Sequence, residues 1–175
     1  MHKSVKIQEM KTILGIETSC DETACAILKK DQNGIQILSN IVTSSASLQA
    51  KYGGIIPEQA AREQIKAIIP VIEEAINDSR LTINDIDAIA VTYGPGLIGS
   101  LLVGVETAKV LAKVWNKPLI PVNHLLGHFY ANFIQVPSSK FQVPKFPCLG
   151  LLVSGGHTDL VLFTNHGEYK YLGGT

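Results

Sequence analysis

Apolar residues alternate with polar ones, or form short apolar runs, near the start of the chain, and this pattern predicts short strands. The expected strands are Thr12 to Glu17, Thr23 to Lys29 and Ile35 to Val42. The polar turn 18–22 separates the first two, and Asn33-Gly34 precedes the third. The pattern therefore predicts a β-meander at the start of the chain.

A helical pattern follows the meander. Pro57 stands where the first turn of a helix accepts proline, and apolar residues then recur at mostly helical spacing as far as Ile72. Pro70 lies inside this pattern, so we expect a kink there.

Strands and helices alternate in the next segment. The pattern predicts a strand at 86–92, a long apolar helix at 97–115, a strand at 119–122 and a helix from His124 to about Gln135. A second hairpin is expected after three prolines that mark an exposed connection. This alternation is typical of the α/β class.

One short pattern occurs twice. Leu14-Gly15, Ser19 and Thr23 recur as Leu149-Gly150, Ser154 and Thr158, at a constant offset of 135 (149 minus 14). Both copies lie between apolar, strand-like runs, which favours a duplication. We therefore expect a first lobe over about 1–121 and a second lobe that begins near 122 and is incomplete at 175, as in the amino-terminal portion of a longer protein.

Composition and charge narrow the class of protein. The chain has 15 Lys and Arg against 15 Asp and Glu, 46% hydrophobic residues and 17% charged residues. These values exclude a basic nucleic-acid-binding arm and a disordered chain. Charged residues interrupt the apolar stretch 97–114, and residues 1–11 lack an apolar signal region, so we expect a cytoplasmic protein without a membrane span.

The cysteine pattern gives no sign of a disulfide framework. The chain has three cysteines and no Cys-x-x-Cys pair, so it also lacks the spacing of a thiolate zinc site. Reduced thiols are the simpler interpretation.

His124 and His128 are four residues apart, which places both imidazoles on one face of a helix, close enough to share a metal ion. Such a pair also arises by coincidence on a surface or in a core. Leu125 stands where a zincin peptidase has its glutamate base, so this pattern disfavours a peptidase. Two imidazoles leave a metal site incomplete, and the usual further ligand is a carboxylate from elsewhere.

The segment 154–158, Ser-Gly-Gly-His-Thr, lets the backbone approach a ligand closely and turn N–H groups toward a phosphate. The alternative is a tight hairpin turn. The matching first turn carries Asp21 and Glu22, which could orient a metal or accept a proton, or could be solvated turn residues.

Gly94, Gly96 and Gly99 have the spacing of a dinucleotide fingerprint between a strand and a helix. Pro95 removes one N–H from the loop, and no acidic residue ends the following strand, so the fingerprint is incomplete. The segment also lacks the Gly-Lys-Ser/Thr of a P-loop. Two interpretations remain, a tight turn lining a ligand cleft and glycines needed for close helix packing.

Five motifs, in this order, resemble those of the bacterial and organellar tRNA N6-threonylcarbamoyladenosine transferases, once mislabelled as O-sialoglycoprotein endopeptidases. The motifs are Gly15-Ile-Glu-Thr-Ser-Cys-Asp-Glu-Thr23, Gly53-Gly-Ile-Ile-Pro-Glu58, Gly94-Pro-Gly-Leu-Ile-Gly-Ser100, Asn123-His-Leu-Leu-Gly-His128 and Leu152-Val-Ser-Gly-Gly-His-Thr158. The resemblance implies the actin-like, Hsp70-like and sugar-kinase-like ATPase fold, an α/β fold with duplicated lobes, of which the second is truncated here.

The resemblance also implies a reaction. The threonylcarbamoyl group of threonylcarbamoyl-AMP moves to N6 of the adenosine following the anticodon, in tRNAs that read codons beginning with A. His124 and His128 would be two ligands of one divalent metal per subunit, iron or zinc. Asp21 or Glu22 would help to deprotonate the attacking amine, which is our own hypothesis. The adenylate, or an adenine nucleotide, would be bound by Leu152, Val153, Ser154, Gly155 and Gly156.

Departures from the family pattern are few. Leu126 stands where many members have Glu, and Gln64 stands where many have His. The second half, in which the family has a metal-binding Asp, is absent, so we expect the 175-residue chain alone to be inactive. Implied partners are tRNA, a same-fold scaffold paralogue and an ATPase companion. The alternatives are that the chain is itself such a non-catalytic scaffold, or a small-molecule kinase of this superfamily.

Overall fold

The computed structural model describes residues 11–32, 34–134, 142–155 and 158–175. These residues divide into two compact units, one that ends at His124 and one that starts at Leu125. The lobe boundary expected from the sequence lies at 121.

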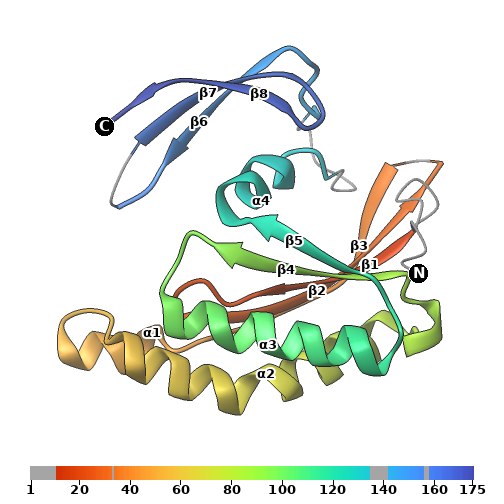
Figure 1. The fold of residues 1–175 in the computed structure, drawn as a ribbon, viewed down its shortest axis with the longest axis vertical. Coiled ribbons are helices and arrows are strands. Elements are labelled where there is room, and N and C mark those ends of the chain that lie inside the picture. The colour runs from red at the N-terminus through yellow and green to blue at the C-terminus, as the bar shows by residue number, and fades with distance from the viewer. Residues whose placement is uncertain (1–10, 33, 135–141, 156–157) are drawn as a thin grey trace. The chain divides into compact units, whose positions relative to one another are not determined.

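The first unit is built on a five-stranded sheet (Figure 1). The order is β3-β2-β1-β4-β5, in which β1, β2 and β3 run antiparallel while β1, β4 and β5 run parallel. The predicted meander is confirmed, and β1 is the central strand. The strands are β1 (Thr12–Glu17), β2 (Glu22–Asp31), β3 (Gly34–Ser44), β4 (Ala88–Gly94) and β5 (Leu119–Asn123).

Two long helices, α2 (Pro57–Ser79) and α3 (Ile98–Val114), pack side by side on one face of this sheet (Figure 1). Pro57 is the first helical residue of α2, as predicted, and the helix continues through Pro70 to its end. Short helical turns complete the unit at α1 (Ala46–Gln49), η2 (Ala50–Tyr52) and η3 (Ile83–Asp85). No helix in the described ranges is long and apolar enough to cross a membrane.

The core of the first unit lies between the sheet and these helices. Alternate residues of β1 and β2 point into it and are at most 2% exposed: Leu14, Ile16, Cys25 and Ile27. The α2 face contributes Ile68, Val71 and Ile72, and the α3 face contributes small residues, Ala108 and Ala112. Burial raises the pKa of the Cys25 thiol to about 12, as expected for a thiol that serves as a small apolar side chain.

The second unit is a three-stranded antiparallel sheet that packs on part of a short helix. Its strands, in the order β6-β7-β8, are β6 (Cys148–Val153), β7 (Thr158–Asn165) and β8 (Glu168–Gly174). Phe129 of helix α4 (His124–Ala131) stacks on Phe163 of β7, with 3.4 Å between ring centroids. The strand β8 was not among the sequence predictions.

Helix α4 is shorter than the sequence pattern predicted. It ends at Ala131, and residues 132–134 are not helical, while Gln135 lies outside the described residues. The side-chain amide of Asn132 donates to the carbonyl oxygens of His128 and Phe129, at 3.2 and 3.0 Å. The backbone N–H groups of Phe133 and Ile134 donate to Tyr130 and Ala131, three residues earlier, so the chain leaves the helix through tight turns.

The two copies of the repeated pattern form hairpins with the same register. Leu14 pairs with Ile27, and Leu149 pairs with Leu162, so both members of the first pair map onto the second at the offset of 135. The shared register agrees with a duplication.

The equivalent faces of the two hairpins nevertheless differ in burial. The first-hairpin residues Leu14 and Ile16 are buried, but their equivalents, Leu149 and Leu151, are each 64% exposed. Leu160, the equivalent of Cys25, is 36% exposed. The second hairpin therefore keeps an apolar face of the kind that the first unit buries under α2 and α3.

We predict opposite effects for the same change at the two equivalent positions. Ile16→Ser lowers the free energy of unfolding by about 3–5 kcal/mol, because it removes a buried side chain and buries a hydroxyl. Leu151→Ser leaves stability within about 0.5 kcal/mol and lowers the binding of an apolar dye such as ANS. Urea denaturation followed by circular dichroism, with dye fluorescence in parallel, measures both effects. Equal destabilisation by the two changes would show that the Leu151 face is buried.

Candidate functional site

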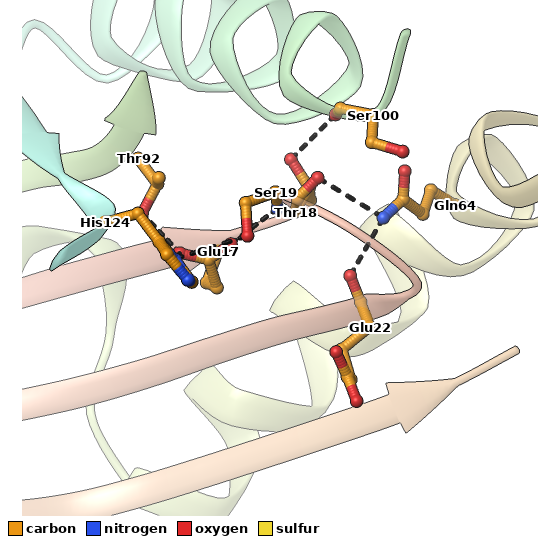
Figure 2. A network of polar contacts seen from close by, with 8 residues as sticks. All are labelled: Glu17, Thr18, Ser19, Glu22, Gln64, Thr92, Ser100 and His124. Atoms are coloured by element: carbon orange, nitrogen blue, oxygen red, sulfur yellow. Dashed lines mark hydrogen bonds and ion pairs between the residues drawn. The ribbon is translucent and has the colours of Figure 1, made fainter. Parts of the chain in front are cut away.

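Polar side chains gather where β1 ends, and the carboxylate of Glu17 is at their centre (Figure 2). Its Oε1 accepts a hydrogen bond from the backbone N–H of Ser19, at 2.5 Å. Its Oε2 accepts from the hydroxyl of Thr92 on β4, at 2.5 Å, and lies 3.1 Å from Nδ1 of His124. Glu17 therefore joins the ends of two parallel strands to the first residue of α4.

The surroundings of Glu17 favour its ionised form. Burial raises the pKa of this carboxyl, but the hydrogen bonds from Ser19, Thr92 and His124 together lower the pKa further than burial raises it. The net result is a pKa below the ordinary value for glutamate, so Glu17 acts as a hydrogen-bond acceptor.

Ser19 and Glu17 contact the same nitrogen of His124. The Ser19 hydroxyl oxygen lies 3.2 Å from Nδ1, close to the Glu17 contact on that atom. A serine nucleophile activated by a histidine needs the hydroxyl and the carboxylate on opposite ring nitrogens. The three residues are therefore not a hydrolase triad, and their geometry instead fixes the orientation of the ring.

The turn after β1 is held by side chains from α2 and α3. The Gln64 amide donates to the Glu22 carbonyl oxygen at 2.8 Å and lies 3.4 Å from that of Thr18 (Figure 2). It also donates to the Cys20 carbonyl oxygen, at 3.1 Å. Thr18 donates to the Ser100 carbonyl at 2.8 Å, and the Ser100 hydroxyl donates to the Cys20 carbonyl at 2.9 Å. The backbone of this polar turn is therefore fixed.

The glycine-rich loop before α3 packs against the same turn. The Leu97 N–H donates to the Ser19 carbonyl at 2.7 Å, and a Cβ at Gly96 would lie 2.5 Å from that oxygen. A Cβ at Gly99 would lie 3.4 Å from Cβ of Ala61 on α2. Close packing therefore explains Gly96, whereas a Cβ at Gly99 would make an ordinary contact.

Asp21 and Glu22 lie on another side of the turn. Asp21 lines an open groove of about 340 Å³ together with Ser44 and Ser45, and the Ser45 hydroxyl donates to the Asp21 carbonyl at 3.0 Å. The Glu22 carboxylate points away from the contact between Glu17 and His124 (Figure 2). Burial raises the pKa of the Glu22 carboxyl, and the negative charge of Asp21 raises it further.

His124 and His128 both lie on α4, as the spacing predicted. The His124 side chain is 27% exposed, and His128 is exposed. Among the residues that the structure describes, no group of three His, Cys, Asp or Glu side chains could hold a metal ion. Within the described part of the chain, the two histidines alone would therefore not complete a metal site.

The predicted adenylate-binding segment begins on a strand. Leu152 and Val153 end β6, and Ser154 and Gly155 follow it, whereas Gly156 lies outside the described residues. A Cβ at Gly155 would meet no heavy atom of the described chain within 4 Å. Unlike Gly96, Gly155 is not explained by packing within the described chain.

Sequence reasoning assigned no role to Glu17, Thr92 or Gln64, although Glu17 lies within the first motif and Gln64 was noted as a departure from the family pattern. Glu17 and Thr92 lie near the ends of parallel strands, where polar residues after an apolar run often indicate a site. Gln64 is 1% exposed. A polar residue within the apolar face of α2 was the sequence feature that could have indicated its role.

Comparisons with known proteins agree on one family. The family described as TsaD, tRNA N6-adenosine threonylcarbamoyltransferase, matches residues 36–175. A protein of that name from Thermomicrobium roseum is 54% identical over 164 residues, covering 93% of this chain and 44% of the relative. One from Dehalococcoides mccartyi is 50% identical over 163 residues, covering 93% of this chain and 48% of the relative. The chain thus spans about half the length of the curated relatives it matches.

Solved structures show the fold. YeaZ from Pseudomonas aeruginosa has a TM-score of 0.56 at 16% identity, covering 94% of this chain and 65% of that one. The Ppx/GppA enzyme of Aquifex aeolicus has a TM-score of 0.51 at 12% identity, covering 95% of this chain and 52% of that one. Both are members of the actin-like ATPase fold, as expected from the motifs.

We predict that Gln64→Leu lowers the free energy of unfolding by about 1–3 kcal/mol, because carbonyl groups in the turn lose their buried donor. Urea denaturation followed by the fluorescence of Trp115, the single tryptophan, measures the effect in the first unit.

Gln36→Leu is the matched control. The Gln36 amide donates to Asp31 at 2.9 Å in an exposed position, so its loss changes stability by no more than about 0.5 kcal/mol. Equal effects of the two substitutions would contradict a special role for Gln64.

Proposed function

Because the chain belongs to the tRNA N6-adenosine threonylcarbamoyltransferase family, we propose that it takes part in the transfer of threonylcarbamoyl from threonylcarbamoyl-AMP to tRNA. The acceptor is N6 of the adenosine that follows the anticodon, in tRNAs that read codons beginning with A. The observation that carries the proposal is the family match over 36–175, which includes the histidine pair and the β6 turn.

The reaction is an acyl transfer. The N6 amine attacks the carbamoyl carbon, a C–N bond forms, the C–O bond to the phosphate breaks, and AMP leaves. The attacking amine loses a proton, and Asp21 or Glu22 is the proposed acceptor. The raised pKa of the Glu22 carboxyl favours that role, since a general base works best with a pKa near the working pH. Gln64 holds the Glu22 carbonyl and so limits where this carboxylate can lie.

A divalent metal, iron or zinc, is the proposed cofactor, with His124 and His128 as two of its ligands. When bound, such an ion polarises a carbonyl or holds a phosphate. What this chain supplies is a helix that presents both imidazoles at a spacing of four residues, and a carboxylate that fixes one of the rings.

The turn after β6 is the proposed site for the adenylate. The segment from Leu152 to Gly156 would place backbone N–H groups near the phosphate, where they stabilise the charge on the departing AMP. The space beside Gly155 supports this proposal, because the described chain itself does not occupy it.

Partners complete the proposal. The chain has no net charge, so we expect companion proteins to supply much of the basic surface that tRNA binding needs. We propose a same-fold scaffold paralogue and an ATPase companion in the cytoplasm.

The paralogue would dock on exposed apolar residues of α2 and α3, where a partner of the same fold could offer its own pair of helices. The exposed residues are Ile65, Ile69, Ile98, Leu102, Val110 and Val114.

The test of function is transfer of labelled threonylcarbamoyl from its adenylate to unmodified tRNA, with companion proteins present. It compares this chain with a fusion that continues it with the carboxyl-terminal portion of the Thermomicrobium roseum relative. We expect activity in the fusion and none in the 175-residue chain, because the described residues offer only two metal ligands.

Substitutions in the fusion separate the proposed roles. His124→Ala with His128→Ala abolishes transfer, and Asp21→Ala or Glu22→Ala lowers kcat by about 100-fold or more if that residue is the base. Full rates in both carboxylate variants would rule out the proposed base. An inactive fusion would favour the scaffold or the kinase alternative.

The docking surface has its own test. Leu102→Lys weakens binding of the paralogue at least about tenfold, because a charge replaces an apolar contact. Calorimetry measures the change, and Leu151→Lys, at an exposed position in the second unit (64% against 52% for Leu102), serves as the control. Equal binding by the Leu102 variant and the unsubstituted chain would exclude this face.

A further inference from the structure

A neutral imidazole ring carries its proton on one nitrogen only, and its hydrogen-bond partners decide which one. Nδ1 of His124 lies 3.1 Å from the Glu17 carboxylate and 3.2 Å from the Ser19 hydroxyl. An ionised carboxylate can only accept, whereas a hydroxyl can donate or accept. The arrangement therefore satisfies both partners when Nδ1 carries the proton.

The Glu17 carboxylate has little freedom to turn away from His124. Its Oε1 accepts from the Ser19 N–H, and the oxygen that faces His124 also accepts from Thr92. Glu17 and Thr92 sit near the ends of β1 and β4, which pair in parallel from Ile13 to Ile16. The sheet thus sets the position of the carboxylate before any ligand binds.

We propose that Glu17 is the positioning residue of His124: its carboxylate holds the ring as the Nδ1–H tautomer and so directs Nε2 toward the metal. The inference rests on the metal role proposed for His124, and it assigns the binding nitrogen and the residue that selects it. Metal-binding histidines commonly donate their second N–H to a carboxylate in this way.

The first test reads the tautomer without any metal. The 175-residue chain, labelled with 15N at its five histidines, is studied by long-range 1H–15N correlation at the alkaline end of a pH series, where imidazole rings are neutral. The signals of His124 are those missing from the His124→Ala spectrum. We expect the pattern of an Nδ1–H ring.

Glu17→Gln should reverse the tautomer, because an amide can donate to Nδ1 and so favours a proton on Nε2. Thr92→Val keeps the carboxylate and should keep the Nδ1–H form. Glu73→Gln, the same change at an exposed position of α2, is the matched control. An Nε2–H ring in the unsubstituted chain overturns the proposal, and so does a ring that Glu17→Gln leaves unchanged. If Glu17→Gln fails to fold, the tautomer of His124 in the unsubstituted chain is the deciding result.

The second test separates this inference from the proposed metal site. Zinc is titrated into the chain by calorimetry, and Glu17→Gln should weaken binding by about 10- to 100-fold. Zinc binding that is unchanged in His124→Ala would refute the metal role proposed for His124. The effect of Glu17 on the His124 tautomer would then be tested by the first measurement alone. Zinc binding that needs His124 but is unchanged in Glu17→Gln would overturn the positioning role.

Discussion

The carboxylate of Glu17 is the point on which the site depends. It ends the central strand of the first sheet, accepts from Ser19 and from Thr92 of β4, and contacts the ring of His124, the first residue of α4. A partly buried carboxylate is costly unless donors surround it, and here every neighbour is able to donate. The hydrogen bonds that offset the cost of burying the Glu17 carboxylate also orient the ring of His124. The same contacts therefore stabilise the fold and set the geometry of the site.

The duplicated hairpin shows how one pattern serves two structural contexts. Leu14 with Ile27 and Leu149 with Leu162 occupy equivalent pairs, yet only the first pair lies in a core covered by α2 and α3. In the first hairpin the turn is fixed by Gln64 and Ser100, whereas in the second a Cβ at Gly155 would meet no atom of the described residues within 4 Å. The first hairpin thus shows how contacts from neighbouring helices hold a polar turn in one conformation.

Local patterns predicted most of the elements, because hydrophobic periodicity and proline or glycine positions determine strands and helices. The strands of the meander, both long helices and the helical placement of His124 and His128 agree with the structure. The predicted end of α4 was wrong, because the backbone after Ala131 forms tight turns, with Phe133 and Ile134 donating to Tyr130 and Ala131, and a pattern of apolar residues does not report such turns. The roles of Glu17, Thr92 and Gln64 arise from contacts across 42 to 107 positions of sequence, which no local pattern contains.

The most direct test of the central claim is a double-mutant cycle between Glu17 and His124 in the 175-residue chain. Glu17→Gln, His124→Ala and the double variant are unfolded in urea, with Trp115 fluorescence as the signal. We expect a coupling free energy of about 0.5–1.5 kcal/mol, the range of a hydrogen bond that is partly shielded from water. A coupling below about 0.3 kcal/mol would contradict the view that this contact organises the site.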